Sequence, residues 1–163
     1  MGFVSVNEID KFRYDDCVME SFEITDKAIC LELEALIVGK NNSQNENYTE
    51  SYAGTTMASF VSGKVLGAIK DGYRYYDANE VLQREVPDTR LSDKETEELI
   101  KKCPGAFLYS IDKTDEKDGL LYAVLGIEFI DETEKTMADS YQIHIVYEKA
   151  IFEWEHYMNR VQA

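Results

Sequence analysis

The sequence predicts an α+β protein that consists mainly of an antiparallel β sheet, either a curved sheet or an open barrel. Three observations support this: apolar and polar residues alternate over residues 18–38, one capped helix lies mid-chain, and residues 150–161 have a helical apolar spacing. The 163 residues suffice for one packed domain, and no change in composition marks a second. We therefore expect a single domain over residues 1–163, with residues 1–10 as a loose lead-in.

Residues 18–38 have the pattern of a β-hairpin that turns at residues 26–27. Pairing the flanks outward from that turn gives one buried and one solvated face. The predicted buried face contains Val18, Glu20, Phe22, Ile24, Ile29, Leu31, Leu33, Ala35 and Ile37, with Val18 opposite Ala35. The predicted solvated face contains Met19, Ser21, Glu23, Cys30, Glu32 and Glu34.

Glu20 is the one carboxylate on the predicted buried face, where it falls opposite Leu33. Burial without a partner raises a carboxyl pKa, so Glu20 is a candidate ligand-gripping or general-acid group inside a barrel. The alternative is that a bulge or the strand edge turns Glu20 outward.

The polar composition of residues 39–50 predicts a mobile loop, and residues 52–86 predict a run of short strands. Residues 55–61 and 64–70 form one expected hairpin through Ser62-Gly63. Asp71-Gly72 predicts a second hairpin turn into residues 73–76, because Asp-Gly favours a type I′ turn. Residues 77–80 then turn the chain into a strand over residues 81–86, which ends at Pro87.

One helix is predicted after this strand. Ser92 and Glu95 have the spacing of a capping box, Leu99, Ile100 and Cys103 supply an apolar stripe, and the helix stops at residues 104–105.

A second hairpin is expected to pair residues 106–111 with residues 120–129 across a loop at 112–119. An acidic, exposed linker over residues 131–139 leads to a strand over residues 141–147. The last segment places Ile151, Trp154, Met158 and Val161 three, four and three residues apart, which predicts an amphipathic C-terminal helix. The alternative is a strand that continues through Phe152, Trp154 and His156.

The charge balance limits the classes of partner. The chain has 17 basic and 32 acidic side chains, a net charge of −15 and a pI near 4.5. This charge disfavours binding to nucleic acid or to an anionic membrane surface, and it attracts a basic protein. The alternative is that the acidity serves solubility alone.

The cysteines and the N-terminal residues indicate a cytoplasmic protein. Cys17, Cys30 and Cys103 are odd in number and lack metal-site or redox spacing, so we expect reduced thiols. The first 25 residues contain no apolar core of a signal peptide.

No motif in the sequence predicts catalysis, a metal or a cofactor. His144 and His156 have no neighbours that resemble members of a catalytic triad, and no glycine-rich phosphate loop is present. Asp112, Asp115 and Asp118 recur every third residue, which differs from the ligand spacing of a calcium loop. We therefore expect a protein that is not an enzyme.

Two resemblances add to this interpretation. Residues 73–79, YRYYDAN, resemble the hairpin of choline-binding-like cell-wall repeats, although the motif occurs once and Glu80 stands in place of glycine. The whole chain is similar in composition to small, acidic, β-rich bacterial proteins, including immunity-type proteins that neutralise toxins. Neither resemblance transfers a binding residue.

Three function classes follow from these observations. The first is a non-catalytic binding protein that docks a basic protein partner, as an immunity protein or adaptor would. Its expected contacts are Glu23, Glu32, Glu34, Tyr73 and Tyr75. The second is a small-ligand binder or enzyme that uses a barrel interior through Glu20. The third is an accessory or self-associating domain without a specific partner, and homo-oligomer formation stays open.

Overall fold

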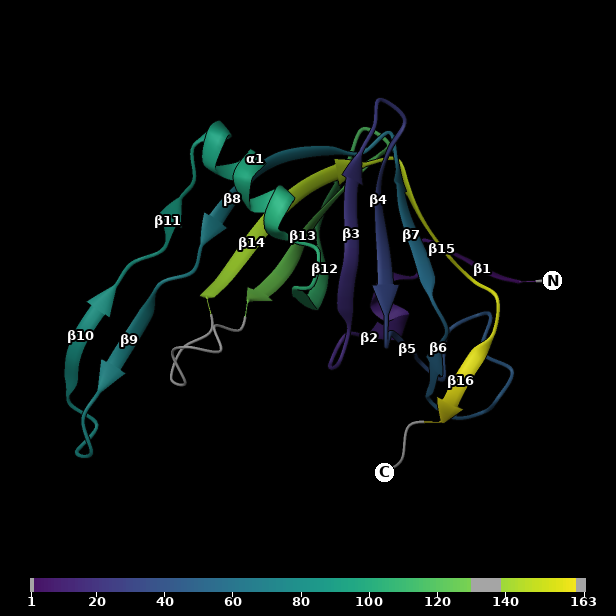
Figure 1. Ribbon diagram of the computed structural model, residues 1–163, viewed down its shortest axis with the longest axis horizontal. Coiled ribbons are helices and arrows are strands. Elements are labelled where there is room, and N and C mark those ends of the chain that lie inside the picture. The colour runs from purple at the N-terminus through teal and green to yellow at the C-terminus, as the bar shows by residue number, and fades with distance from the viewer. Residues whose placement is uncertain (1, 130–138, 161–163) are drawn as a thin grey trace.

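The computed structural model describes residues 2–129 and 139–160, and within these ranges the chain is mostly antiparallel β sheet with a single α-helix (Figure 1). The main sheet has ten strands and two edges, so it is a curved open sheet and not a closed barrel. In spatial order its strands are β1 (Phe3–Val6), β15 (Lys149–Trp154), β7 (Thr56–Val61), β4 (Ala28–Glu34), β3 (Val18–Ile24), β12 (Phe107–Lys117), β13 (Leu120–Phe129), β14 (Asp139–Tyr147), β8 (Lys64–Lys70) and β11 (Thr89–Arg90).

Two smaller sheets and two helical segments complete the described part of the fold. One sheet is the pair β9 (Tyr73–Tyr76) and β10 (Leu82–Val86). The other has the order β16 (Tyr157–Arg160), β6 (Ser51–Ala53), β5 (Ile37–Val38) and β2 (Phe12–Arg13). The helical segments are the 3₁₀ turn η1 (Ile9–Lys11) and the helix α1 (Asp93–Lys102).

The β3–β4 hairpin confirms the predicted turn but corrects the register beyond it. Phe22 pairs with Leu31 as expected, but the register shifts between Met19 and Ser21, so that Val18 pairs with Glu34. This bulge directs Met19 into the core, where it is fully buried, and leaves Glu20 exposed. Of the two interpretations of Glu20, the buried one is wrong and the alternative, in which a bulge turns Glu20 outward, is confirmed, because the extra residue lets the apolar Met19 take the core position.

The predicted hairpin at Ser62-Gly63 is also wrong, because β7 continues into β8 through a bend. Across this bend β7 pairs with β15 and β8 pairs with β14, and β14 likewise runs into β15 at Glu148. The two bends face each other, since the Glu148 N–H donates to the carbonyl of Val61. The pairs β7–β15 and β8–β14 therefore form one long, bent ribbon, which joins the half of the sheet that contains β4 to the half that contains β13.

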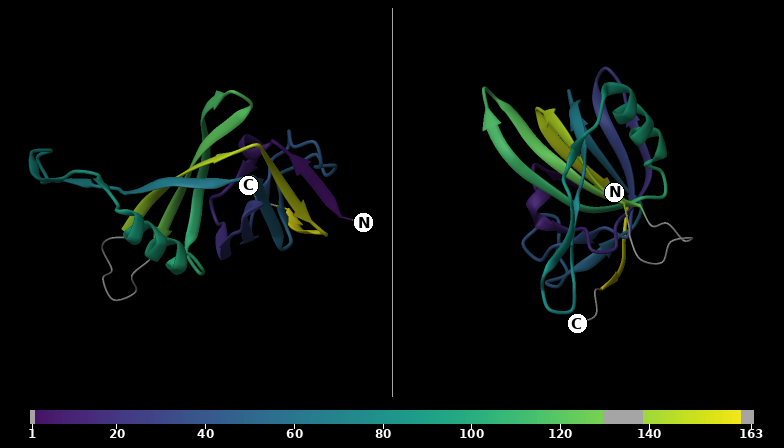
Figure 2. Two further views of the ribbon diagram at one scale, coloured as in Figure 1. Left: turned by 90° about the horizontal axis from the view of Figure 1, so that it is seen from above. Right: turned by 90° about the vertical axis from the view of Figure 1, so that its left-hand side faces the viewer.

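Asp71-Gly72 is a crossing point between sheets and not the predicted hairpin turn. β8 pairs with β11 and β9 pairs with β10, so residues 64–90 run out and back as one long hairpin whose turn lies at residues 77–80 as expected. We call its outer part, β9 and β10, the projecting arm. The Gly72 N–H donates to Asp88 Oδ1 across the hairpin. Figures 1 and 2 show that β9 and β10 extend away from the rest of the molecule.

The helix α1 confirms the sequence prediction at both ends. Both hydrogen bonds of the Ser92–Glu95 capping box are formed, and Leu99 and Cys103 are buried. After the helix, Gly105 takes a positive φ of 91° and its N–H donates to the carbonyl of Met19. The chain therefore leaves the helix beside the bulge of β3, where β12 begins.

The β12–β13 hairpin is longer than expected. The strands continue as far as the two-residue turn Asp118-Gly119, whose residues have φ values of 55° and 79°. Residues 112–117 are therefore strand and not loop. The predicted linker at residues 131–139 lies outside the described residues except for Asp139.

The C-terminal amphipathic helix is absent from the described residues, which form β15 and β16 instead. Ala150, Phe152 and Trp154 alternate with more exposed residues and point into the core. Phe152 and Trp154 pack on Phe12, with ring centroids 4.7 and 5.8 Å from it. The three-four-three spacing was misleading because this aromatic packing and the pairing with β7 and β1 decide the conformation; Val161 lies outside the described residues.

Candidate functional site

The outward sides of β1, β15, β7, β4 and β3 form one continuous surface, which we call the outer face. Strand register defines two rows of side chains across it, since directly paired residues point to the same side of a sheet. The first row is Val4, Glu153, Met57, Glu32 and Ser21. The second row is Val6, Ile151, Ser59, Cys30 and Glu23.

The opposite sides of the same strands form the core. The row between the two outer rows consists of Ser5, Phe152, Ala58, Leu31 and Phe22, all of which are buried. The outer face is therefore held by a fully packed inner layer, and the sheet fixes the backbone positions from which its side chains project.

The outer face combines apolar side chains with carboxylates. Val4 and Val6 are each 46% exposed and Met57 is 40% exposed. Glu32 lies beside Met57, Glu153 lies between Met57 and Val4, and Glu23 ends the second row.

Glu34 and one lysine complete the charges of this surface. Glu34 follows Glu32 on the same side of β4, and its carboxylate accepts a hydrogen bond from the Thr55 hydroxyl. Lys149, which pairs with Val61 in the next row, is the single basic residue among these described rows. The surface is strongly negative because it carries one lysine and four glutamates, namely Glu23, Glu32, Glu34 and Glu153.

A shallow depression of about 400 Å³ opens at the edge of the outer face. It is lined by Gly2, Phe3, Val4, Thr55, Met57, Glu153, Trp154 and Glu155. Its walls are thus partly apolar, and its charged groups are the two carboxylates Glu153 and Glu155. Such a depression can accept an apolar or a cationic side chain.

The predicted contact residues fall into two separate groups. Glu23, Glu32 and Glu34 lie together on the outer face, whereas Tyr73 and Tyr75 lie on β9, far from it (Figure 1). The two tyrosine rings contact each other edge to face, with centroids 5.0 Å apart. The structure therefore brings the glutamates into one surface and places the tyrosines on the projecting arm.

Glu20, the predicted ligand-binding residue, does not line an interior. Its side chain is exposed at the β3 bulge, where Met19 occupies the core position.

A chain of polar contacts runs over β12 and β14 on the other half of the sheet. The carboxylate of Asp71 accepts hydrogen bonds from Ser140 (2.6 Å) and Gln142 (2.7 Å), and Tyr109 contacts Ser140 at 3.0 Å. His144 Nε2 contacts Gln142 Oε1 at 3.2 Å, and no hydrogen bond joins His144 to Ser140 among the described residues. These residues link β8 to β14, and their order differs from that of a catalytic triad.

The loop over residues 39–50 is held by a buried carboxylate that the sequence analysis missed. Glu8 is 8% exposed and accepts hydrogen bonds from Ser5 Oγ at 2.7 Å and from the Ser43 N–H at 3.0 Å, with Lys11 Nζ at 3.5 Å. Burial alone raises the pKa of Glu8, but the hydrogen bonds from Ser43 and Ser5 and the charge of Lys11 outweigh it and lower the pKa. In the sequence, the three-residue spacing of Ser5 and Glu8 was the one signal that these two side chains could form a hydrogen bond.

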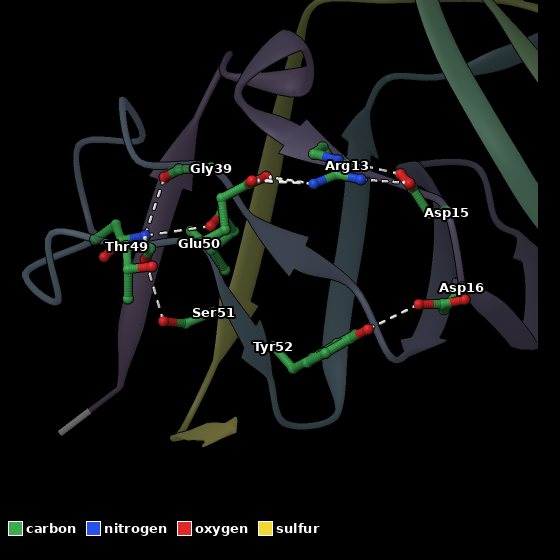
Figure 3. A network of polar contacts seen from close by, with 10 residues as sticks. Arg13, Asp15, Asp16, Gly39, Thr49, Glu50, Ser51 and Tyr52 are labelled. Atoms are coloured by element: carbon green, nitrogen blue, oxygen red, sulfur yellow. Dashed lines mark hydrogen bonds and ion pairs between the residues drawn. The ribbon is translucent and has the colours of Figure 1, made fainter. Parts of the chain in front are cut away.

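Surface contacts fasten the end of this loop to β2 (Figure 3). Arg13 bridges Asp15 and Glu50, and the Tyr52 hydroxyl donates to Asp16 at 2.7 Å. Asp15 and Glu50 are therefore paired with a cation, whereas no ion pair to Glu23, Glu32, Glu34 or Glu153 is present among the described residues.

The cysteines are free thiols, as predicted. Burial raises the pKa of Cys17 and of Cys103 to about 12, which makes both poor nucleophiles. Within residues 2–129 and 139–160, no three His, Cys, Asp or Glu side chains are arranged to hold a metal ion.

A comparison with known protein families, curated proteins and solved structures found no match to this chain. None of the helices in the described segments has the length and apolar character needed to cross a membrane.

Proposed function

We propose that this protein is a non-catalytic binding protein whose outer face docks a basic protein partner, as an immunity protein or an adaptor does. The observation that carries the proposal is the gathering of Glu23, Glu32, Glu34 and Glu153 around exposed apolar residues on one rigid sheet surface. The three free thiols support a reducing compartment such as the cytoplasm.

The composition of the outer face supports a protein partner over a small ligand. Val4, Val6 and Met57 supply apolar area, which the centre of a protein interface requires. The carboxylates around them complement lysine and arginine and increase the rate of encounter with a positively charged protein. The open, shallow depression lacks the enclosure that small-molecule sites have.

The projecting arm is the proposed second contact. A two-stranded hairpin is marginally stable in water, and Tyr75, Tyr76 and Leu82 expose 42 to 55% of their surface there. Tyrosine is enriched at binding hot spots, so a partner that covers the arm would gain apolar contacts and stabilise it.

The proposal is tested by comparing two variants of equal net charge. The first carries Glu23→Gln, Glu32→Gln, Glu34→Gln and Glu153→Gln. The control carries Glu97→Gln, Glu98→Gln, Asp115→Asn and Asp118→Asn, all exposed positions away from the outer face. Each is used to capture proteins from an extract of the native host at about 0.05 M and about 0.3 M salt.

We expect a basic protein to be captured by the wild type and by the control at low salt, and to be lost from the outer-face variant. Higher salt should weaken the capture because it screens the charges. Equal loss from both variants would mean that net charge alone attracts the protein, and the specific docking surface would then be refuted.

A further inference from the structure

The strand β1 is an edge strand without the usual features that prevent further pairing. Its sequence, FVSV, contains no proline, lysine or glycine, and its register with β15 has no bulge. Val4 and Val6 are each 46% exposed. The opposite edge of the sheet, β11, has two residues and offers far less backbone.

The hydrogen-bond phase of β1 shows which backbone groups are unpaired. The Asn7 N–H donates to the carbonyl of Ala150 at 2.8 Å, so this group points toward β15. N–H groups alternate in direction along a strand, so those of Phe3 and Ser5 also point toward β15. The N–H and C=O groups of Val4 and Val6 therefore point away from the sheet, and no hydrogen bond beyond β15 engages them among the described residues.

The charges beside this edge determine the kind of strand that fits. Glu153 pairs with Val4, and Glu155 lines the depression next to it. A strand added to β1 would lie two strand spacings, about 10 Å, from β15, a distance that extended lysine and glutamate side chains span together. Basic side chains on the outer side of an added strand would thus meet Glu153 while its backbone bonds Val4 and Val6.

We infer that β1 binds an extended, cationic segment of the partner by antiparallel β-strand addition. The inference rests on the proposed function and specifies how the partner is held: backbone hydrogen bonds to Val4 and Val6 give affinity, and Glu153 selects alternating basic residues. A second copy of the chain fits less well, because two molecules of net charge −15 repel each other.

Hydrogen exchange with a model peptide tests the inference directly. The probe is an acetylated, amidated octapeptide of alternating lysine and valine, and the control peptide has glutamate in place of lysine. In the free protein we expect the Val4 and Val6 amides to exchange much faster than that of Ser5, which bonds to β15. Addition of the lysine peptide should slow exchange at Val4 and Val6 at least tenfold, and the glutamate peptide should leave it unchanged.

Two variants separate backbone pairing from side-chain contact. Val4→Pro and Val4→Ala both remove the valine side chain, but Val4→Pro also removes the outward N–H and leaves the bonds to β15 intact. We expect Val4→Pro to bind the lysine peptide at least about tenfold more weakly than Val4→Ala, with Val6→Pro against Val6→Ala as the second pair. Fluorescence of Trp154, the single tryptophan, confirms that each variant is folded.

The outcomes distinguish this inference from the proposed function. Unchanged exchange at Val4 and Val6, or equal binding by the proline and alanine variants, would refute strand addition even if the outer-face glutamates still captured a basic partner. If exchange at Val4 and Val6 instead becomes slower as the protein concentration rises without peptide, and light scattering shows a dimer, the edge pairs with a second copy of the chain. That result would also refute the inference.

Discussion

The outer face and the projecting arm both expose apolar side chains, but they differ in what holds them. Behind Met57 and Glu32 lies a continuous buried row that includes Phe152 and Leu31, and the strands that carry Met57 and Glu32, β7 and β4, each pair with a strand on both sides. The arm residues Tyr73–Tyr76 pair with β10 alone, and this pair belongs to a separate two-stranded sheet. The outer face is therefore a preformed surface, whereas the arm depends on local contacts that a partner can supplement.

The largest expected difference is in the cost of removing an apolar side chain. Leu31 is fully buried behind the outer face, so Leu31→Ala should lower the free energy of unfolding by about 2–5 kcal/mol. Leu82 on the arm is 45% exposed, and Leu82→Ala should cost less than about 1 kcal/mol. Chemical denaturation of both variants measures the difference, and equal costs would mean that the arm is as well packed as the core.

The second expected effect concerns Glu8, which fixes the loop beside β1. Glu8→Gln should cost about 1–3 kcal/mol at neutral pH, because a neutral amide accepts weaker hydrogen bonds from Ser5 and Ser43 than a carboxylate does. The arm has no buried carboxylate among its described residues, so the effect is confined to the β1 side of the molecule.

The effect of Glu8 depends on pH in a defined direction. Its pKa is lower in the folded protein than its ordinary value of 4.5, so its stabilisation is present above pH 4.5 and is lost as the pH falls through the folded pKa. The difference between wild type and Glu8→Gln, measured by thermal or chemical unfolding from pH 7 to pH 3, should therefore shrink below pH 4.5. A constant difference over this range would contradict the assigned role.

Sequence reasoning succeeded where local signals decide the structure and failed where tertiary pairing does. The alternation around Phe22 and Leu31 and the capping box at Ser92 each specify local geometry, and both were predicted correctly. Asp71-Gly72 carries the same dipeptide signal as Asp118-Gly119, yet only the latter is a hairpin turn. The difference is set by strand partners distant in the sequence, which no local pattern reports.

The candidate site was predictable only in part for the same reason. Glu23, Glu32 and Glu34 share a face through the β3–β4 register, which the alternation revealed. Glu153 and Val4 join them through β15 and β1, which come from opposite ends of the chain. For Glu20 the sequence left a buried and an outward-turned position open, because a bulge depends on the neighbours of the strand, here the hydrogen bonds of Met19 with residues 105–106.

The smallest effect on global stability, and the sharpest test of the comparison, is expected at Gly72. A Cβ atom there would overlap the carbonyl oxygen of Val86 and lie 2.5 Å from the carbonyl carbon of Pro87, so Gly72→Ala must displace the backbone where the arm leaves the main sheet. If the arm is held by local contacts alone, its amides at residues 73–76 should lose protection from hydrogen exchange while the core loses less than about 1 kcal/mol.

Gly67→Ala on β8, the strand that precedes Gly72 and the arm, provides the matched control. A Cβ atom at Gly67 would meet the flexible end of Arg90 at 3.3 Å, which can move aside, so exchange at residues 73–76 should stay at the wild-type rate. A global loss of several kcal/mol in Gly72→Ala would show that the arm is coupled to the core. The arm would then be a preformed surface like the outer face, and a partner would gain nothing by stabilising it.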